Sequence, residues 1–221
     1  MPDYISALDL FTIGIGPSSS HTVGPMRAAL LFAEEIHAKG HLPNTHSVSV
    51  TLYGSLGATG PGHGTTNAIV SGLAGSTPEG CDPNQVLVAW NNAIESKTWH
   101  VLNHKIRFSE SDFSFQPLMR LEKHSNAMKF RAHAANNDVL LEQVYYSVGG
   151  GFVEADHEII RPQRPEVPNS FINVEHLLDI CEREEKTIAQ IAHENELFLH
   201  GELLLTTKLE AIWSAMENCI E

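Results

Sequence analysis

Residues 46–53 read His-Ser-Val-Ser-Val-Thr-Leu-Tyr, and residues 54–64 continue as Gly-Ser-Leu-Gly-Ala-Thr-Gly-Pro-Gly-His-Gly. In the first segment valine and leucine alternate with serine and threonine, which is the period of a strand with one buried face. The glycine-rich segment is predicted to be a loop, and residues 65–73 are predicted to form a helix that stops before Gly75. A strand, a loop and a helix therefore form the centre of the predicted fold.

The flanking segments add one helix before this centre and several strands after it. Apolar residues recur at helical spacing from Pro25 to Lys39, and Gly40 is a suitable stop. Further strands are predicted over His104–Ser109, Ala127–His133 and Val139–Val148. Because helices and strands do not alternate regularly to the end of the chain, we predict an α+β sandwich with a mixed or antiparallel sheet and helices on one face.

The C-terminal part is predicted to be separate and helical. Residues 161–173 contain several prolines and are predicted to be a linker, whereas residues 174–221 have a mostly helical pattern. The expected organisation is one domain over residues 1–160, the linker over 161–173 and a helical segment over 174–221.

Composition and charge exclude several classes of protein. The 221 residues are 42% hydrophobic and carry 14 Lys and Arg against 27 Asp and Glu, a formal charge of -13. This negative field disfavours nucleic acid and anionic membranes as partners. No apolar run reaches the roughly 18 residues of a membrane-spanning helix, and the N-terminus lacks the basic segment of a signal peptide. We expect a soluble, cytoplasmic protein.

The cysteines Cys81, Cys181 and Cys219 lie far apart in the sequence and form no C-x-x-C motif. Their odd number and wide spacing indicate reduced thiols and match no zinc or iron-sulfur pattern. We therefore expect that this chain by itself binds no metal through sulfur.

Candidate chemistry is concentrated in two glycine-rich loops. The first, residues 14–25, reads Gly-Ile-Gly-Pro-Ser-Ser-Ser-His-Thr-Val-Gly-Pro and ends where the first long helix begins. Backbone amides at a helix N-terminus attract an anionic group, and the hydroxyl and imidazole groups of residues 18–22 add donors around it. A carboxylate or phosphate site is predicted there. The plainer alternative is an elaborate N-cap, since serine and threonine are favoured caps.

The second loop repeats this design, with glycines, one histidine and then hydroxyls that open a helix. His63 lies between Gly62 and Gly64, so neighbouring side chains do little to bury it. A histidine held open in this way can exchange protons near neutral pH. The alternative is an ordinary exposed loop histidine.

Taken together, residues 13–25 and 60–65 closely resemble the N-terminal, or beta, domain of bacterial iron-sulfur-dependent L-serine dehydratases. The Ser-Ser-Ser-His-Thr core is highly specific, and the similarity continues through residues 146–152 (Tyr-Ser-Val-Gly-Gly-Gly-Phe) and 187–190 (Thr-Ile-Ala-Gln). Such domains are also similar in fold to an allosteric serine-binding domain of some phosphoglycerate dehydrogenases, with an α-β-α-β-β-β core.

The resemblance implies a β-elimination in which L-serine gives pyruvate and ammonia without pyridoxal phosphate. In the complete enzyme a four-iron four-sulfur cluster acts as Lewis acid while a protein base removes the α-proton. His63 is the candidate base, and His21 positions it or relays protons. The residues expected to bind the substrate are Ser18, Ser19, Ser20, Thr22, Gly62, Gly64, Thr65 and Asn67.

The resemblance also implies a second, alpha domain that supplies the cluster cysteines, and a homo-oligomeric enzyme. This chain stops at Glu221, before any such domain. It is expected to be inactive alone, either as part of a longer chain or as one subunit of a two-chain enzyme. Two alternatives stay open: an allosteric amino-acid sensor without chemistry of its own, and a phosphate-binding domain of unrelated function.

Overall fold

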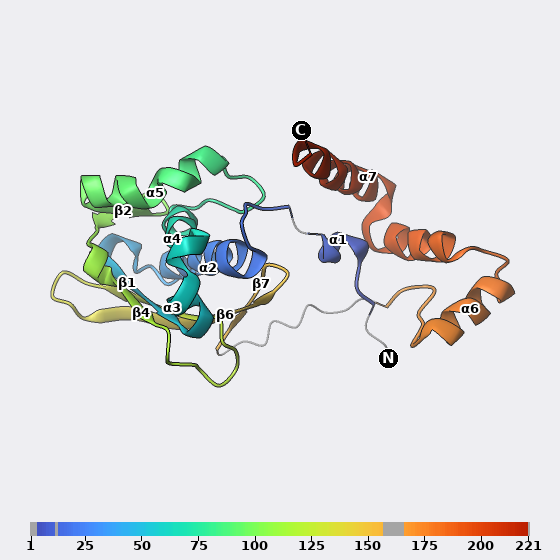
Figure 1. The fold of residues 1–221 in the computed structure, drawn as a ribbon, viewed down its shortest axis with the longest axis horizontal. Helices are drawn as coiled ribbons and strands as arrows, with labels where there is room; N and C mark the ends of the chain where they lie inside the picture. Colours follow the sequence, from blue (N-terminus) through green and yellow to red (C-terminus); the bar gives the residue numbers. More distant parts are fainter. Residues whose placement is uncertain (1–3, 12, 157–165, 221) are drawn as a thin grey trace. The chain divides into compact units, whose positions relative to one another are not determined.

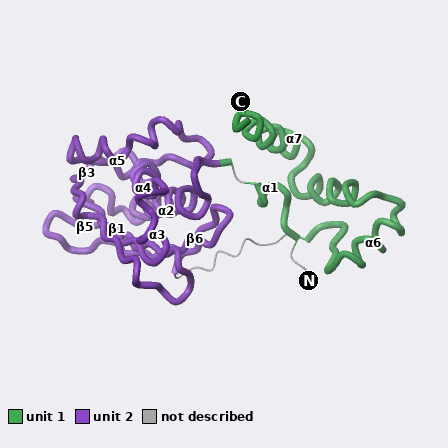
Figure 2. Tube along the Cα trace, viewed as in Figure 1, with its two compact units in different colours: residues 1–13, 161–221 green, residues 14–160 purple. Residues whose placement is uncertain are grey.

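The computed structural model describes residues 4–11, 13–156 and 166–220. The chain forms two compact units, residues 14–160 and residues 1–13 with 161–221 (Figure 2). The first residues of the predicted linker, 161–165, lie outside the described residues, as does the predicted domain boundary at residue 160.

The first unit is built on a five-stranded mixed sheet in the order β4-β1-β5-β6-β7. Strand β4 runs parallel to β1, and the remaining neighbours are antiparallel. The mixed sheet and the α+β class are thus confirmed. The strands are β1 (Ser47–Tyr53), β4 (Phe113–Gln116), β5 (Ala127–His133), β6 (Val139–Gly149) and β7 (Phe152–Ala155).

Helices α2 and α4 lie on one face of this sheet (Figure 1). A short π-helix, η1 (Ser19–Val23), leads directly into α2 (Gly24–Ala38). The other helical segments of this unit are η2 (Leu42–Asn44), α3 (Gly54–Thr59), η3 (Pro61–His63), α4 (Thr65–Leu73), α5 (Pro83–Ser96) and η4 (Glu110–Asp112).

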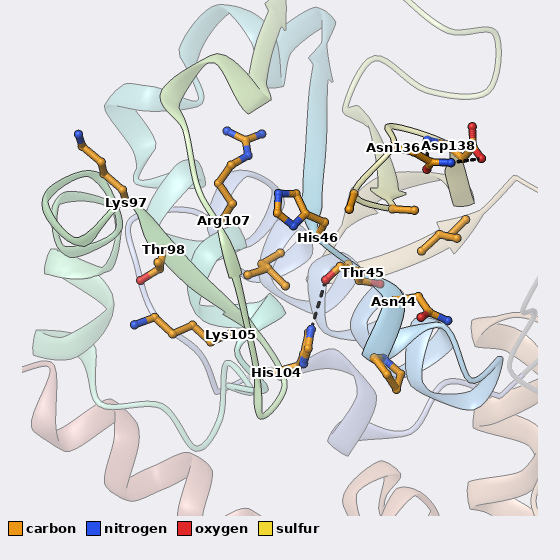
Figure 3. Close-up of a pocket in the computed structure, with 15 residues that line it drawn as sticks. Asn44, Thr45, His46, Lys97, Thr98, His104, Lys105, Arg107, Asn136 and Asp138 are labelled. Atoms are coloured by element: carbon orange, nitrogen blue, oxygen red, sulfur yellow. Dashed lines mark hydrogen bonds between the residues drawn. The ribbon is translucent and has the colours of Figure 1, made fainter.

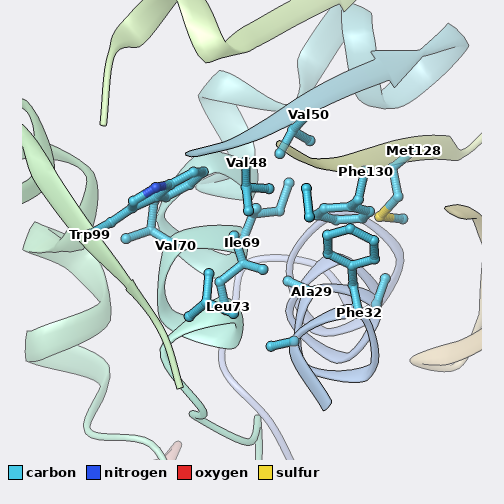
Figure 4. Packing of buried hydrophobic residues seen from close by; sticks show 14 of the residues in the cluster. Ala29, Phe32, Val48, Val50, Ile69, Val70, Leu73, Trp99, Met128 and Phe130 are labelled. Carbon is cyan, nitrogen blue, oxygen red and sulfur yellow. The ribbon is translucent and has the colours of Figure 1, made fainter. Parts of the chain in front are cut away.

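The hydrophobic core lies between the sheet and these two helices (Figure 4). Val48, Val50 and Leu52, the alternate residues of β1, are completely buried. Phe130 of β5 stacks on Phe32 of α2, with ring centroids 5.3 Å apart. The intervening residues of the strands face the other side and are largely polar, for example Ser49, whose Oγ lies 2.8 Å from His133 Nε2. The alternation of residues 46–53 therefore decides which face the helices cover.

Several parts of this unit differ from the sequence prediction. The segment expected to be a loop from residue 54 contains helix α3. The predicted strand at residues 104–109 is β3 (His104–Arg107), which pairs with β2 (Thr98–Val101) in a separate two-stranded sheet. Helix α5 and strand β4 were not predicted.

The second unit is helical, as expected for residues 174–220. It contains α1 (Ala7–Leu10), α6 (Val174–Arg183) and α7 (Ile188–Asn218), and α7 is interrupted at Gly201, which has φ 70° and ψ 160°. The carboxylate of Glu196 on α7 accepts hydrogen bonds from Tyr4 Oη, Ser6 Oγ and Ala7 N and so holds the segment around α1. Within the described ranges, no helix has the length and apolar character needed to cross a membrane.

Candidate functional site

The first glycine-rich loop forms a tight, capped entry into α2. Ser18 caps η1, since its Oγ accepts from His21 N at 3.3 Å and its carbonyl oxygen accepts from Thr22 N at 2.9 Å. In the described part of the chain, the backbone amides of Ser19 and Ser20 donate to no protein acceptor. Two free amide donors at the start of a helical segment are a suitable place for an anionic group.

Two buried threonines join this loop to the second one. Thr22 Oγ1 donates to the carbonyl oxygen of His63 at 3.0 Å, and Thr65 Oγ1 donates to the carbonyl oxygen of His21. The exposed fractions of Thr22 and Thr65 are 2% and 0%. Because each hydroxyl is buried and bonded to the other loop, the two loops are held at one place in the fold.

These bonds place the two candidate histidines side by side. The ring centroids of His21 and His63 are 5.1 Å apart, with an angle of 44° between the ring planes. His21 lies between two hydroxyls: its Nδ1 is 2.9 Å from Ser20 Oγ, and its Nε2 is 3.0 Å from Ser55 Oγ. Both rings are only partly buried, so a ligand can reach them.

The hydrogen bond of His63 determines its neutral tautomer. His63 Nδ1 lies 2.9 Å from the carbonyl oxygen of Thr59, and a carbonyl oxygen only accepts. The proton of the neutral ring is therefore on Nδ1, and Nε2 carries the lone pair. No described residue forms a hydrogen bond with Nε2. His63 thus presents a basic nitrogen that is available to a ligand, which is the arrangement required of a general base.

The surroundings of His21 lower its pKa. Burial lowers its pKa below the ordinary value of 6.5, and the neighbouring His63 lowers it further. A neutral His21 between two hydroxyls can accept or donate a hydrogen bond at either nitrogen. It is suited to orienting His63 or passing a proton, and not to binding an anion by charge.

The remaining residues predicted to bind the substrate do not all lie beside the histidine pair. Asn67 is apart from the histidine pair, because its Oδ1 accepts from Trp90 N of α5 at 2.9 Å. Gly62 and Gly64 flank His63 with open space at their Cα atoms. Gly64 has φ 67°, so the turn into α4 depends on its conformational freedom. Ser19 is exposed.

Two further residues of the site were not predicted. Ser55 Oγ contacts His21, and the carbonyl oxygen of Thr59 orients His63. Ser55 lies just beyond the C-terminal end of β1, and that position was the available signal, since residues at strand ends commonly face a site. The contribution of Thr59 comes from the backbone of α3, in a segment whose glycines predicted a loop.

A different hollow, of about 950 Å³, lies at the opposite end of β1 (Figure 3). Three cationic side chains line it, but Figure 3 shows Lys97, Lys105 and Arg107 extending in separate directions. The guanidinium of Arg107 is paired with Asp112 at 2.9 Å. Polar groups that do not converge on one point fit no particular ligand, so we assign the functional site to the two loops instead.

The side chains that the structure describes do not fit an iron-sulfur cluster. Cys81 lies in one unit, Cys181 and Cys219 lie in the other, and within residues 4–11, 13–156 and 166–220 no three His, Cys, Asp or Glu side chains are grouped to hold a metal. Burial raises the pKa of the Cys81 thiol, which disfavours the thiolate that a metal requires.

Comparison with known proteins identifies the family. Residues 6–158 match the family model of the serine dehydratase beta chain. The chain is 38% identical to an L-serine dehydratase of Mycobacterium bovis over 97% of its own length and 47% of the relative, and 33% identical to one of Haemophilus influenzae over 98% and 49%. It is 35% identical to L-serine dehydratase 1 of Escherichia coli over 98% and 48%.

The chain therefore spans about half the length of the curated relatives it matches. The matched residues contain both glycine-rich loops, the π-helix η1 and the histidine pair. This chain belongs to the serine dehydratase beta chain family.

Proposed function

We propose that this chain is the serine-binding and proton-abstracting part of an L-serine dehydratase, which converts L-serine to pyruvate and ammonia. The observation that carries the proposal is the geometry of His63. Its Nε2 is the basic nitrogen of the neutral ring, and it lies in the cluster that also contains His21 and the capped loop. The names of the relatives support the substrate.

In this proposal each part of the site has one task. The free amides of Ser19 and Ser20 and the nearby hydroxyls bind the substrate carboxylate at the start of η1. Nε2 of His63 removes the α-proton, the carbonyl oxygen of Thr59 orients the ring, and His21 packs beside it. The β-hydroxyl takes up a proton and departs as water, and the enamine that remains tautomerises to the imine. A second water then hydrolyses the imine to pyruvate and ammonia.

Activation of the departing hydroxyl is assigned to the other half of the enzyme. The relatives are about twice as long as this chain, and we propose that their remaining half carries the four-iron four-sulfur cluster. Helix α7 supports an association of this kind, because several large apolar side chains on it are exposed: Phe198, Leu203, Leu204, Leu209, Trp213 and Met216. Large apolar side chains that stay exposed often mark an interface with another protein.

The test combines this chain, under anaerobic conditions, with a polypeptide that supplies the other half, and measures pyruvate formed from L-serine. We expect His63→Gln to lower turnover by roughly 100-fold or more, the usual contribution of a general base, while L-serine still binds. His46→Gln is the matched control, since His46 is exposed and lies at the opposite end of β1.

The control is expected to keep full turnover. If His63→Gln keeps it as well, His63 is not the base. If this variant changes only the dependence of the rate on L-serine concentration, the chain is an allosteric sensor of the amino acid instead.

A further inference from the structure

The segment between β4 and β5, residues 117–126, begins with a tight turn whose side chains are apolar and exposed. Gln116 O accepts from Met119 N at 3.2 Å, which closes a β-turn with Pro117 and Leu118 at its centre. The exposed fraction is 98% for Leu118, the most exposed of the large apolar side chains that the structure describes, and 52% for Met119. In Figure 1 this segment is the yellow-green loop that extends away from the sheet. The turn therefore presents a leucine side chain to solvent.

Both ends of the segment are bonded to the start of α3. The carbonyl oxygen of Met119 accepts from Gly54 N at 2.8 Å, and the carbonyl oxygen of Ser125 accepts from Ser55 N at 3.2 Å. A Cβ atom on Gly54 would collide with the carbonyl oxygen of Ser125, so this close approach requires glycine. Proline at the second position of the turn fixes φ there in advance. The conformation of the turn is thus set by its own chain.

The segment has anchors other than Leu118. The side chain of Leu121 packs against a buried cluster made of Tyr53, Ala127 and Tyr146. Lys123 Nζ donates to the carbonyl oxygen of Asp156 at 2.6 Å. Because Leu118 is almost completely exposed, its side chain contributes nothing comparable to the fold. A preformed turn with an exposed leucine at its centre is suited to contact with another protein surface.

The same hydrogen bonds connect the turn to the histidine pair. The turn is bonded to the residue that precedes Ser55, and Ser55 Oγ lies 3.0 Å from His21 Nε2. Helix α3 also supplies the carbonyl oxygen of Thr59, which lies 2.9 Å from His63 Nδ1. A protein that binds Leu118 is therefore held at a set position relative to both rings.

We propose that Leu118 docks in an apolar pocket on the half of the dehydratase that lies outside this chain. This chain covers 47% and 49% of the length of two L-serine dehydratases, and the proposed reaction needs that other half to reach the substrate while His63 acts on it. A turn attached to α3 meets this need, because it fixes the docked half relative to His63 and loses little freedom on binding. The inference rests on the proposed function and adds a contact beside the histidines to the apolar surface of α7.

The test is an anaerobic calorimetric titration of the 221-residue chain with a polypeptide that supplies the other half. We expect Leu118→Ser to weaken the pairing of the two halves by roughly 10- to 100-fold, the loss typical of an interface anchor. Leu118→Met should retain most of the affinity, because an apolar side chain of similar volume remains. Leu87→Ser is the matched control, since Leu87 on α5 is 69% exposed, and it should leave the affinity unchanged.

Two further measurements separate docking from folding and from chemistry. Because Leu118 is exposed, Leu118→Ser should leave the urea midpoint of unfolding unchanged. Its turnover of L-serine should be low at low concentrations of the other half and should recover at high concentrations. His63→Gln should behave in the opposite way, with unchanged pairing and slow turnover at every concentration.

Equal affinity of the unmodified chain and Leu118→Ser for the other half overturns this inference and leaves the proposed function in place. Sedimentation of the chain alone tests the other occupant. If it shows dimers that Leu118→Ser dissociates, and pairing with the other half is unaffected, the turn binds a second copy and the inference is wrong. If the unmodified chain does not pair with the other half, the proposed association fails together with this inference.

Discussion

The rings of His21 and His63 lie 5.1 Å apart, and each histidine's carbonyl oxygen accepts a hydrogen bond from a threonine of the other loop. These two hydrogen bonds tie together the loops that carry the rings. Protonation of one imidazole at this distance disfavours protonation of the other. This effect is the second cause of the lowered pKa of His21, after burial.

The charge coupling between the histidines is measurable. We expect the pKa of His21 to lie below 6.5 in the unmodified chain. In His63→Gln this pKa should rise, because the electrostatic effect of His63, the second cause that lowers it, is then absent. Burial, the larger cause, remains, so the pKa should still stay below 6.5. The measurement is a proton NMR titration of the ring resonances.

His46→Gln is the control for this titration and should leave the His21 resonances in place. The depressed pKa also means that the unfolded chain binds this proton at higher pH than the folded one, so His21 lowers stability as the pH falls below 6.5. A His21 that titrates at 6.5 in the unmodified chain would contradict the buried, paired environment.

The threonine links should contribute to stability. Thr65→Val keeps the shape of the side chain but leaves the carbonyl oxygen of His21 without its donor in a buried place. We expect a loss of about 1–3 kcal/mol in the free energy of unfolding, measured by urea denaturation. Thr207→Val is the control, because Thr207 Oγ1 also donates to a carbonyl oxygen but is exposed on α7. Equal effects of the two substitutions would mean that the link between the loops contributes nothing.

The predicted elements that the structure confirms are those with a strong local pattern. Val48, Val50 and Leu52 alternate with polar residues, and helix α2 follows a glycine and proline pair at its start. Helix α5 had a comparable signal, since Asp82 caps it and Pro83 occupies its first turn, but that signal was not used. Strand β4 had no such local signal. Its four residues form a strand because they pair in parallel with β1, which is far away in the sequence.

The candidate site was also predictable only where it has a strong local sequence pattern. The two loops are visible as local clusters of glycine, serine and histidine, so His21 and His63 could be proposed from the sequence. Ser55 had one signal, its position just beyond β1, but its contact with His21 is formed from α3, in a segment whose glycines favour a loop.

The two glycines beside His63 should differ in their tolerance of a side chain. Neither has an atom within 4 Å of an added Cβ, but only Gly64 has a positive φ. We expect Gly64→Ala to lower the free energy of unfolding by about 1–2 kcal/mol through left-handed strain. Gly62→Ala should be neutral or stabilising by up to about 1 kcal/mol, because it restricts the unfolded chain. Urea unfolding of both variants is the measurement, and an equal loss in both would refute the conformational argument.

In the helical unit, Glu196 should make the attachment of the N-terminal segment sensitive to pH. Burial raises the pKa of this carboxyl, but the hydrogen bonds from Ser6, Ala7 and Tyr4 outweigh it, so the pKa lies below the ordinary 4.5. A group with a depressed folded pKa stabilises fully above 4.5 and loses its contribution as the pH falls through the folded pKa.

Amide hydrogen exchange at Ala7, whose N–H donates to Glu196 at 2.9 Å, reports on this attachment directly. After correction for the intrinsic pH dependence of exchange, protection should decline below pH 4.5 in the unmodified chain. Glu196→Gln should lower the opening free energy at neutral pH by about 1–3 kcal/mol and flatten the decline, because the charged acceptor is gone. Glu202→Gln, at an exposed position of the same helix, should match the unmodified chain. Undiminished Ala7 protection in Glu196→Gln would show that the segment is held by packing and not by this carboxylate.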